Sequence, residues 1–350
     1  MDQNTIKRRK LGLIDKDIEK MRPGYILYAL QTGGGIVDLI DKNGKKVHKW
    51  KMPVRPGRDA VILPWNGNLG YSGSHEKSVN LYPAWDIWHG GHFFEVTPEG
   101  KIVWEFEDPY HHHDSVWLEN GNILYAAAQR IPGNEEIIGD VVKEVNRKGE
   151  LVWEWKSWER LNMEKFKNHE NFPQDHYPMI NGLSLTKKGN VLMSLRNTSG
   201  IICVDRHVNN GCVIWDFPYP NVAQQHCPSQ LDNENILCFD NGNIRPNSLV
   251  HSRIVEFVPI TKKIVWTYTD PMPSAFFSPY MGSVERLGNG NNLICESAYG
   301  RIFEITKNKE TVWEYVIPDF AEYPEPLNSF ITGSHNSCFK AHHYDSINWL

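Results

Sequence analysis

Several residues of this sequence lie in phrases whose side chains could carry out chemistry. His226 opens "HCPSQLDNENILCFDN", and His113 belongs to "YHHHDSVWLENGNIL". An imidazole is mostly neutral near pH 7, because its pKa is about 6.5, and a neutral imidazole is a nucleophile that can also move protons. Arg196 ends "GLSLTKKGNVLMSLR", and an arginine fork stabilises anionic oxygen atoms. Whether these groups act together depends on the elements that carry them.

Two short phrases recur along the chain. The first is a turn followed by Val or Ile, Trp, usually an acidic residue and an aromatic residue. Its Trp position, occupied by histidine in the first copy, falls at residues 48, 104, 153, 215, 266 and 313. The second is an apolar strand, an Asn/Gly turn and another apolar strand, at 60–73, 115–128, 182–196, 228–241 and 283–297. Asn-Gly supplies the positive φ that a two-residue hairpin needs. Each unit of roughly 50 residues therefore predicts four strands, which is the content of one propeller blade.

The repeats predict an all-β fold, a single six-bladed β-propeller over residues 22–350 preceded by an N-terminal extension, residues 1–21. Five units are complete and the sixth is split between the ends of the chain. Residues 24–50 supply three strands, and residues 336–350 could supply the missing inner strand. Such closure removes sheet edges that invite aggregation. Two β-sandwiches are the alternative, but the chain has no linker and a sandwich pair does not explain six similar phrases.

The aromatic residues of the first phrase are interpreted as packing between blades rather than as a cofactor site. The longest interval between copies contains residues 156–180. Its apolar residues have a loose helical spacing, and Pro173 and Pro178 end that pattern. We interpret this segment as an insertion that either lines a substrate pocket or covers strand ends.

Polar residues are expected to converge at the starts of the inner strands. Aligning the second phrase on the last Leu before its turn brings His113 and His226 into register, with the third unit's equivalent near Asn181 and the first unit's at Arg58. The following strands end at Arg196 and Asn241. His112 is an alternative to His113. A structural strand end has little use for such a set, so we interpret it as a functional site.

Composition excludes some function classes. The formal net charge is −5 and charged residues are 23%, so neither nucleic acid nor an anionic membrane is an expected partner. No apolar run is long enough for a transmembrane helix, and the basic N-terminal segment has no apolar stretch after it. These features favour a cytoplasmic protein. Its six cysteines, none in a CxxC pair, are expected to be reduced and partly buried.

The phrases "HHDSVWLENGNIL", "NGLSLTKKGNVLMSLR" and "QHCPSQLDNENILCFDNGN" resemble the arylsulfotransferase family, the type that works without PAPS. The likeness extends from about residue 24 to 344. It implies a six-bladed propeller in which a histidine takes a sulfuryl group from an aryl sulfate and passes it to a phenol. No cofactor is implied, and the partner would be an aromatic or sulfated small molecule.

The resemblance also implies roles for individual residues. His226 matches the nucleophile, and Asn241 lies in the matching FDNG phrase. Arg196 and Asn181 match residues that bind the sulfuryl oxygens, and His113 or His112 matches a further active-site histidine. The family pattern His-x-Asn places a histidine two residues before Asn181, where this chain has Met179; His176, three residues earlier, is the nearest histidine. This departure fits a divergent branch.

Two other functions remain open from the residues alone. One is a hydrolase or lyase in which the histidines, with carboxylates such as Asp114, hold a metal ion. The other is a non-catalytic scaffold, because propellers often bind proteins on their faces. The scaffold predicts that the polar channel residues can be replaced without loss, and the metal enzyme predicts a bound ion.

Overall fold

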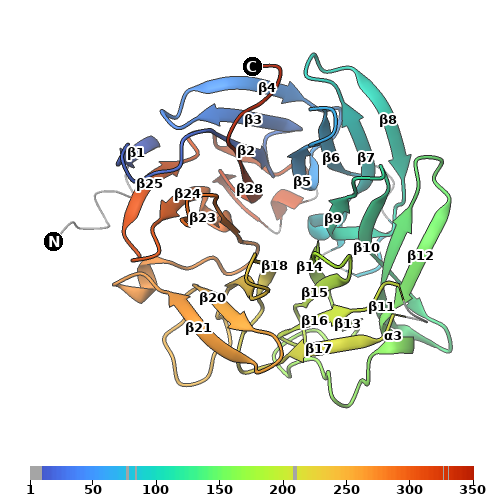
Figure 1. The fold of residues 1–350 in the computed structure, drawn as a ribbon. Helices are drawn as coiled ribbons and strands as arrows, with labels where there is room; N and C mark the ends of the chain where they lie inside the picture. Colours follow the sequence, from blue (N-terminus) through green and yellow to red (C-terminus); the bar gives the residue numbers. More distant parts are fainter. Residues whose placement is uncertain (1–9, 76–78, 83–84, 208–210, 326, 330) are drawn as a thin grey trace. The chain divides into compact units, whose positions relative to one another are not determined.

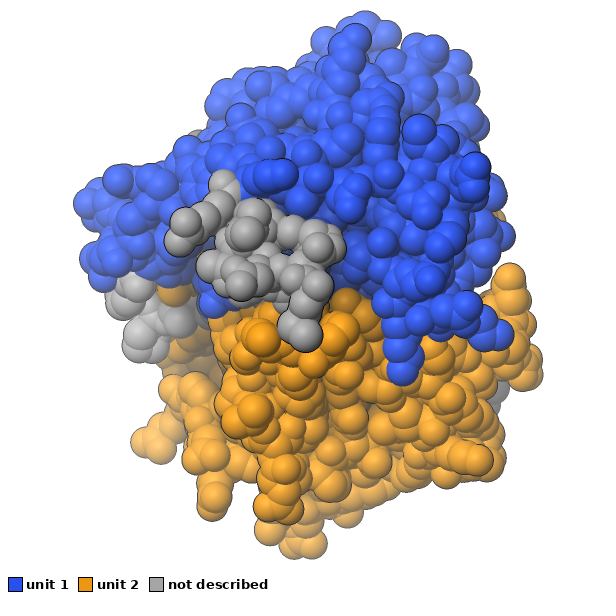
Figure 2. All heavy atoms as spheres, turned by 90° about the vertical axis from the view of Figure 1, so that its left-hand side faces the viewer, with its two compact units in different colours: residues 1–76, 92–107, 280–350 blue, residues 77–91, 108–279 orange. Residues whose placement is uncertain are grey.

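The computed structural model describes residues 10–75, 79–82, 85–207, 211–325, 327–329 and 331–350 (Figure 1). Antiparallel sheets dominate this part of the chain. They fall into two compact units: residues 1–76, 92–107 and 280–350 make up unit 1, and residues 77–91 and 108–279 make up unit 2 (Figure 2). The sheets are the blades of a six-bladed β-propeller, which confirms the predicted fold class.

Unit 1 holds three of the larger sheets found in the described residues. One contains β28 (Cys338–Tyr344), β2 (Tyr25–Leu30), β3 (Ile36–Asp41) and β4 (Lys46–Lys51), in that order. The next contains β5 (Pro56–Ile62), β6 (Leu69–Ser74), β7 (Gly91–Val96) and β8 (Ile102–Glu107). The last contains β22 (Ser283–Arg286), β23 (Asn292–Glu296), β24 (Arg301–Ile305) and β25 (Thr311–Val316), with β1 (Gly12–Lys16) paired to β25. A small ribbon joins β26 (Ala321–Glu322) and β27 (Ser334–His335).

Unit 2 repeats this plan in its own described residues. One sheet contains β9 (His111–Trp117), β10 (Ile123–Ile131), β11 (Asn134–Val145) and β12 (Leu151–Lys156), and β13 (His176–Tyr177) pairs with β11 in parallel. The second contains β14 (Ile180–Leu185), β15 (Val191–Leu195), β16 (Gly200–Val204) and β17 (Val213–Phe217). The third contains β18 (His226–Gln230), β19 (Ile236–Asp240), β20 (Arg253–Val258) and β21 (Lys263–Tyr268).

Helices are short throughout the described residues. They are α2 (Trp85–Trp88), α3 (Ser157–Arg160) and the 3₁₀ turns η1 (Pro273–Ala275), η2 (Ser297–Tyr299) and η3 (Leu327–Ser329). Only the single turn α3 realises the helical spacing noted between residues 156 and 180, and the rest of that segment consists of turns before β13. Within the described part of the chain, no helix is both long enough and apolar enough to cross a membrane.

The split blade is completed by the C-terminal strand, as the repeats predict. β28 pairs antiparallel with β2, from Tyr25 opposite Tyr344 to Leu30 opposite Cys338. The two paired strands, β28 and β2, therefore come from opposite ends of the sequence. This pairing covers a strand edge that would otherwise expose unpaired backbone groups.

The cores lie between neighbouring sheets of a unit. In unit 2, Leu124 and Val142 of one sheet pack with Ile180, Met193 and Ile202 of the next, and all are fully buried. The repeated aromatic residues belong to this packing. Trp155 Nε1 donates to the carbonyl of Gly211 at 2.9 Å, in the β16–β17 turn region of the neighbouring sheet. In unit 1, the indoles of Trp50 and Trp313 donate in the same way to Thr97 and Lys42. These three tryptophans therefore pack between neighbouring sheets, as the sequence predicts.

A partly buried ion pair in unit 1 gives one pH-dependent prediction. His342 Nε2 on β28 lies 2.9 Å from Asp59 Oδ1 on β5. Burial lowers the pKa of His342, but Asp59 more than offsets this effect, so the pKa is raised above its ordinary value. The stabilisation is complete below the unfolded pKa of about 6.5 and is lost as the pH rises through the higher folded pKa.

We therefore expect His342→Gln to lower the free energy of unfolding more at about pH 6 than at about pH 9. Urea titrations at both pH values measure this difference. His207→Gln is the control, because His207 is exposed and its ring contacts a backbone carbonyl, that of Lys188. An equal loss for His342→Gln at both pH values would contradict the assignment.

Candidate functional site

Three inner strands of unit 2 carry half of the eight predicted site residues: His112 and His113 on β9, Asn181 on β14 and His226 on β18. β9, β14 and β18 lie side by side (Figure 1). Four non-glycine residues within two positions of the starts of these strands have left-handed backbones: His113 (φ 57°), Met179 (φ 62°), Gln224 (φ 55°) and Cys227 (φ 49°). Each such residue costs about 1–3 kcal/mol, and strain of this kind is typical of functional sites. Left-handed residues are therefore found near the starts of all three strands.

His226 has a fixed orientation at the start of β18. Its ring is buried, and Nδ1 lies 2.7 Å from Asn241 Oδ1. The amide of Asn241 is itself oriented, because its Nδ2 donates to the carbonyl of Ser278 at 2.8 Å. Since Oδ1 can only accept, His226 Nδ1 must carry the proton. In the neutral ring, the lone pair therefore lies on Nε2.

Asn181 lies in the next sheet, on β14, and is fully buried. Its Nδ2 donates at 2.9 Å to the carbonyl of Gln225, which is the residue just before His226. Ser194 Oγ donates to the same carbonyl at 2.8 Å. The two bonds hold the peptide that leads into His226. Asn181 Oδ1 is buried and has no hydrogen-bond partner among the described residues.

Arg196 is a partly buried cation just after β15. Its Nη1 contacts Met179 Sδ at 3.6 Å and Asn197 Oδ1 at 3.2 Å, and its guanidinium carbon lies 5.5 Å from the centre of the Phe172 ring. With its amide turned so that the oxygen faces Arg196, Gln224 accepts from both Nη1 and Nη2. No carboxylate of the described residues forms an ion pair with Arg196. Burial lowers its pKa to about 10, so the group remains positively charged near pH 7.

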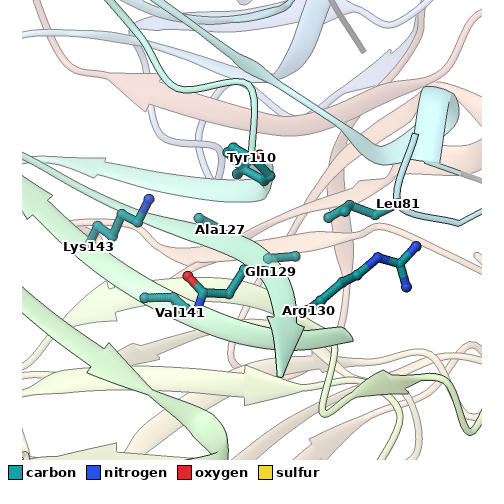
Figure 3. A pocket seen from close by; sticks show the side chains of 8 residues that line it. Leu81, Tyr110, Ala127, Gln129, Arg130, Val141 and Lys143 are labelled. Carbon is teal, nitrogen blue, oxygen red and sulfur yellow. The ribbon is translucent and has the colours of Figure 1, made fainter. Parts of the chain in front are cut away.

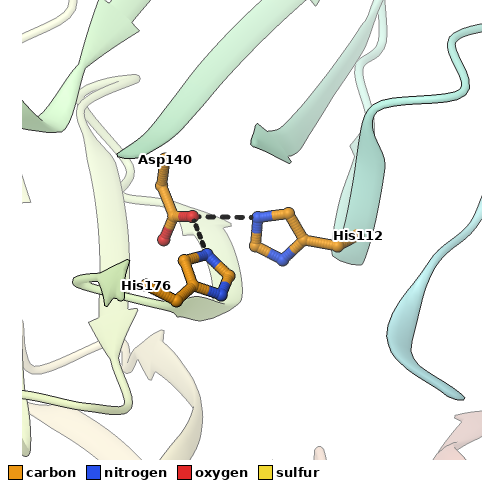
Figure 4. A group of neighbouring side chains, drawn as sticks. All are labelled: His112, Asp140 and His176. Atoms are coloured by element: carbon orange, nitrogen blue, oxygen red, sulfur yellow. Dashed lines mark hydrogen bonds and ion pairs between the residues drawn. The ribbon is translucent and has the colours of Figure 1, made fainter. Parts of the chain in front are cut away.

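A second cluster forms around Asp140 (Figure 4). Asp140 Oδ1 lies 2.6 Å from His176 Nε2 and 3.1 Å from His112 Nε2, and its other oxygen accepts the backbone N–H of Ile180. All three side chains are at most 1% exposed. Burial alone would raise the pKa of Asp140, but His176 and His112 lower it to about 2. Burial lowers the pKa of His112.

The two clusters are linked through β14, and the Asp140 cluster also contacts His113. His112 Nδ1 lies 2.7 Å from His113 Nδ1, so one of these nitrogens donates to the other. Ile180, whose N–H bonds Asp140, directly precedes Asn181 on β14. A continuous path of contacts therefore runs from Asp140 to the peptide that positions His226.

The structure brings together seven of the predicted site residues within unit 2: His112, His113, His176, Asn181, Arg196, His226 and Asn241. Arg58 instead lies in unit 1 on β5, where its Nη1 donates to Gln31 Oε1 at 3.0 Å. Asp114, the carboxylate suggested for a metal site, accepts backbone N–H groups from Ser115 and Leu183.

Sequence analysis missed Asp140 and the partner role of Gln224. The signal for Asp140 was a lone carboxylate in the apolar run "IIGDVV" of a strand, a position that normally requires a partner. His176 falls in the 156–180 segment, which thereby contributes to the cluster. Met179 occupies the place of the family histidine and contacts Arg196 through sulfur.

Unit 2 also has a cavity of about 420 Å³ beside β10 and β11 (Figure 3). Tyr110, Gln129, Arg130 and Lys143 line it together with small apolar residues. Lys143 is paired with Asp108 at 2.8 Å. None of the predicted catalytic side chains lines this cavity.

The sequence matches the family model for arylsulfotransferase (ASST) over residues 100–221 and 216–323, which together exceed half of the chain. No protein with a curated description matches. Three solved structures share the fold. A protein of unknown function from Bacteroides caccae has a TM-score of 0.57 at 16% identity, over 84% of this chain and 93% of that one. A streptogramin B lyase has a TM-score of 0.50 at 12% identity, over 89% and 86%. A putative 6-phosphogluconolactonase from Bacteroides uniformis has a TM-score of 0.50 at 9% identity, over 87% of each chain.

Proposed function

The chain belongs to the arylsulfotransferase family, and on this premise we propose that it transfers a sulfuryl group from an aryl sulfate to a phenolic acceptor through a covalent sulfohistidine at His226. The observation that carries the proposal is the pair His226–Asn241. Because Asn241 Oδ1 accepts from Nδ1 at 2.7 Å, the lone pair of a neutral His226 is held on Nε2.

The transfer has two balanced steps. In the first, His226 Nε2 forms a bond to sulfur, and the bond from sulfur to the aryl oxygen breaks, with its electron pair leaving on the phenolate. In the second, the oxygen of an acceptor phenol bonds to sulfur, and the N–S bond breaks, returning its pair to Nε2. The leaving phenolate takes up a proton and the acceptor phenol releases one. His113 is the candidate to supply and receive it.

Arg196 supports this chemistry by its charge. The three sulfuryl oxygens carry delocalised negative charge, which an arginine fork can stabilise. Arg196 has no carboxylate partner in the described residues, so its positive charge is available to an anion. The neighbouring Phe172 ring provides an aromatic surface beside it.

Asn181 supports the proposal as a positioning residue. Its Nδ2 donates to the carbonyl of Gln225, which precedes the nucleophile. In this orientation the remaining amide atom is an oxygen, and an oxygen cannot donate a hydrogen bond to a sulfuryl group. Direct sulfuryl binding by Asn181 would require its amide to turn.

The test is nitrophenol release from 4-nitrophenyl sulfate by the purified protein, with and without added phenol. We expect release that requires phenol, parallel double-reciprocal plots, and a trapped sulfohistidine on the peptide containing His226 in mass spectrometry. Release without phenol would indicate a hydrolase, the second enzyme class considered above. No release from the folded protein would overturn the proposal.

A further inference from the structure

We propose that His112, Asp140 and His176 form a binding site for a divalent transition-metal ion, with Zn²⁺ as the representative ion. The three side chains come from β9, β11 and β13, elements of one sheet in unit 2, and they point toward one another (Figure 4). The inference concerns binding of a metal and does not depend on sulfuryl transfer at His226.

The geometry matches a metal site before any ion is added. One ligand atom from each residue lies within 4.8 Å of the others, and Asp140 Oδ1 is 2.6 and 3.1 Å from the two imidazole nitrogens. Zinc ligands at about 2.0–2.2 Å in a tetrahedron stand roughly 3.4 Å apart. Asp140 Oδ1 therefore needs to move away from each imidazole nitrogen by less than about 1 Å.

The charge balance also favours a cation. Asp140 is 0% exposed, and among the described residues its side-chain partners are the two imidazoles rather than Lys or Arg, which are always charged near pH 7. A buried carboxylate is costly unless it is paired or coordinates a metal. His176 Nδ1 is buried and has no hydrogen-bond partner among the described residues, so the present hydrogen bonds do not satisfy this ring either.

The ligands are held in place by other contacts, as metal ligands normally are. Asp140 Oδ2 accepts from Ile180 N–H, and the backbone carbonyl of His176 accepts from Asn168 and Asn197. His112 uses Nδ1 toward His113. If Nε2 of His112 binds the metal, Nδ1 carries the ring proton and donates a hydrogen bond to His113 Nδ1.

The ligand types select the class of ion. Two imidazoles and one carboxylate suit Zn²⁺, Fe²⁺ or similar first-row ions, whereas Ca²⁺ and Mg²⁺ prefer oxygen alone. No cysteine belongs to the cluster. Water or a substrate atom would complete the coordination, as in metal sites with three protein ligands.

The experiment uses untagged full-length protein made in zinc-supplemented medium and dialysed against metal-free buffer. We expect about one metal ion per chain by mass spectrometry of the metal content. Asp140→Asn and His176→Gln should each weaken binding more than the ~10- to 100-fold typical of outer contacts. His207→Gln, the exposed histidine control, should bind as wild type.

Two outcomes would overturn the site. One is a wild-type protein that retains no metal and takes up none during prolonged dialysis against Zn²⁺. The other is binding that both cluster variants leave unchanged. If the variants do not fold, the absorption spectrum of the wild-type protein with bound Co²⁺ tests the site. Bands typical of nitrogen and oxygen ligands support the site, and a thiolate charge-transfer band contradicts it.

Discussion

Replacing His226 by alanine is expected to lower kcat for nitrophenol release by at least ~10³-fold, roughly 4 kcal/mol in the activation barrier. The reason is that alanine has no atom that can form the covalent intermediate. Water attacks the sulfur far less effectively than an imidazole that the protein holds in position. The measurement is initial rates at saturating 4-nitrophenyl sulfate and phenol, together with the loss of the sulfohistidine adduct.

Asn241→Ala separates positioning from nucleophilic attack. The His226 ring remains, but it loses the acceptor that fixes its proton on Nδ1. We expect a smaller loss in kcat, about 10- to 100-fold, and a changed pH profile with the adduct still detectable. His251→Gln is a control from the connection before β20, because His251 contacts Arg245 and the Leu249 carbonyl instead. Activity retained by His226→Ala would contradict the nucleophile assignment.

Replacing Arg196 by methionine is expected to lower kcat/KM by about 10²- to 10³-fold. The guanidinium is the cation in this site without a carboxylate partner in the described residues, so its loss removes charge stabilisation from the sulfuryl oxygens. Arg196→Lys keeps the charge without the fork and should recover part of the rate. The measurement is kcat/KM for the aryl sulfate at fixed phenol.

Stability distinguishes this role of Arg196 from a structural one. A partly buried charge with no ionic partner lowers stability, so Arg196→Met should leave the free energy of unfolding unchanged or raise it. Arg130→Met is the control, because Arg130 is exposed and donates only to the carbonyl of Glu135. A loss of stability in Arg196→Met that matches its loss of activity would indicate a packing role.

Under the proposed function, Arg196 and the neighbouring Phe172 ring would contact the anionic and the aromatic parts of an aryl sulfate. Met179 supplies neither charge nor a strong hydrogen bond to an oxyanion. The histidine that the family pattern expects there is absent, while His176 turns to Asp140. If the metal site is occupied, its ion lies in the cluster that contacts His113 through His112.

The sequence by itself determined the division of the chain into blades and the positions of the site residues along the inner strands. Strand pairing within a blade is local, because each hairpin turn fixes the register of the strands beside it. For this reason, aligning the hairpins placed His113, Asn181 and His226 at neighbouring strand starts. The pairing of β28 with β2 was predicted from the number of repeats, because five complete units and one partial unit leave a single strand missing.

Only the tertiary structure decided which side chains meet and through which atoms. Asp140 reaches His176 because β13 pairs in parallel with β11, a contact made by a segment outside the repeat. Arg58, equivalent in the alignment, pairs with Gln31 in unit 1. The proton on His226 Nδ1 depends on Asn241, whose amide is fixed by the distant Ser278 carbonyl. Local periodicity sets the direction of a strand residue, whereas its hydrogen-bond partners are set by packing between segments remote in sequence.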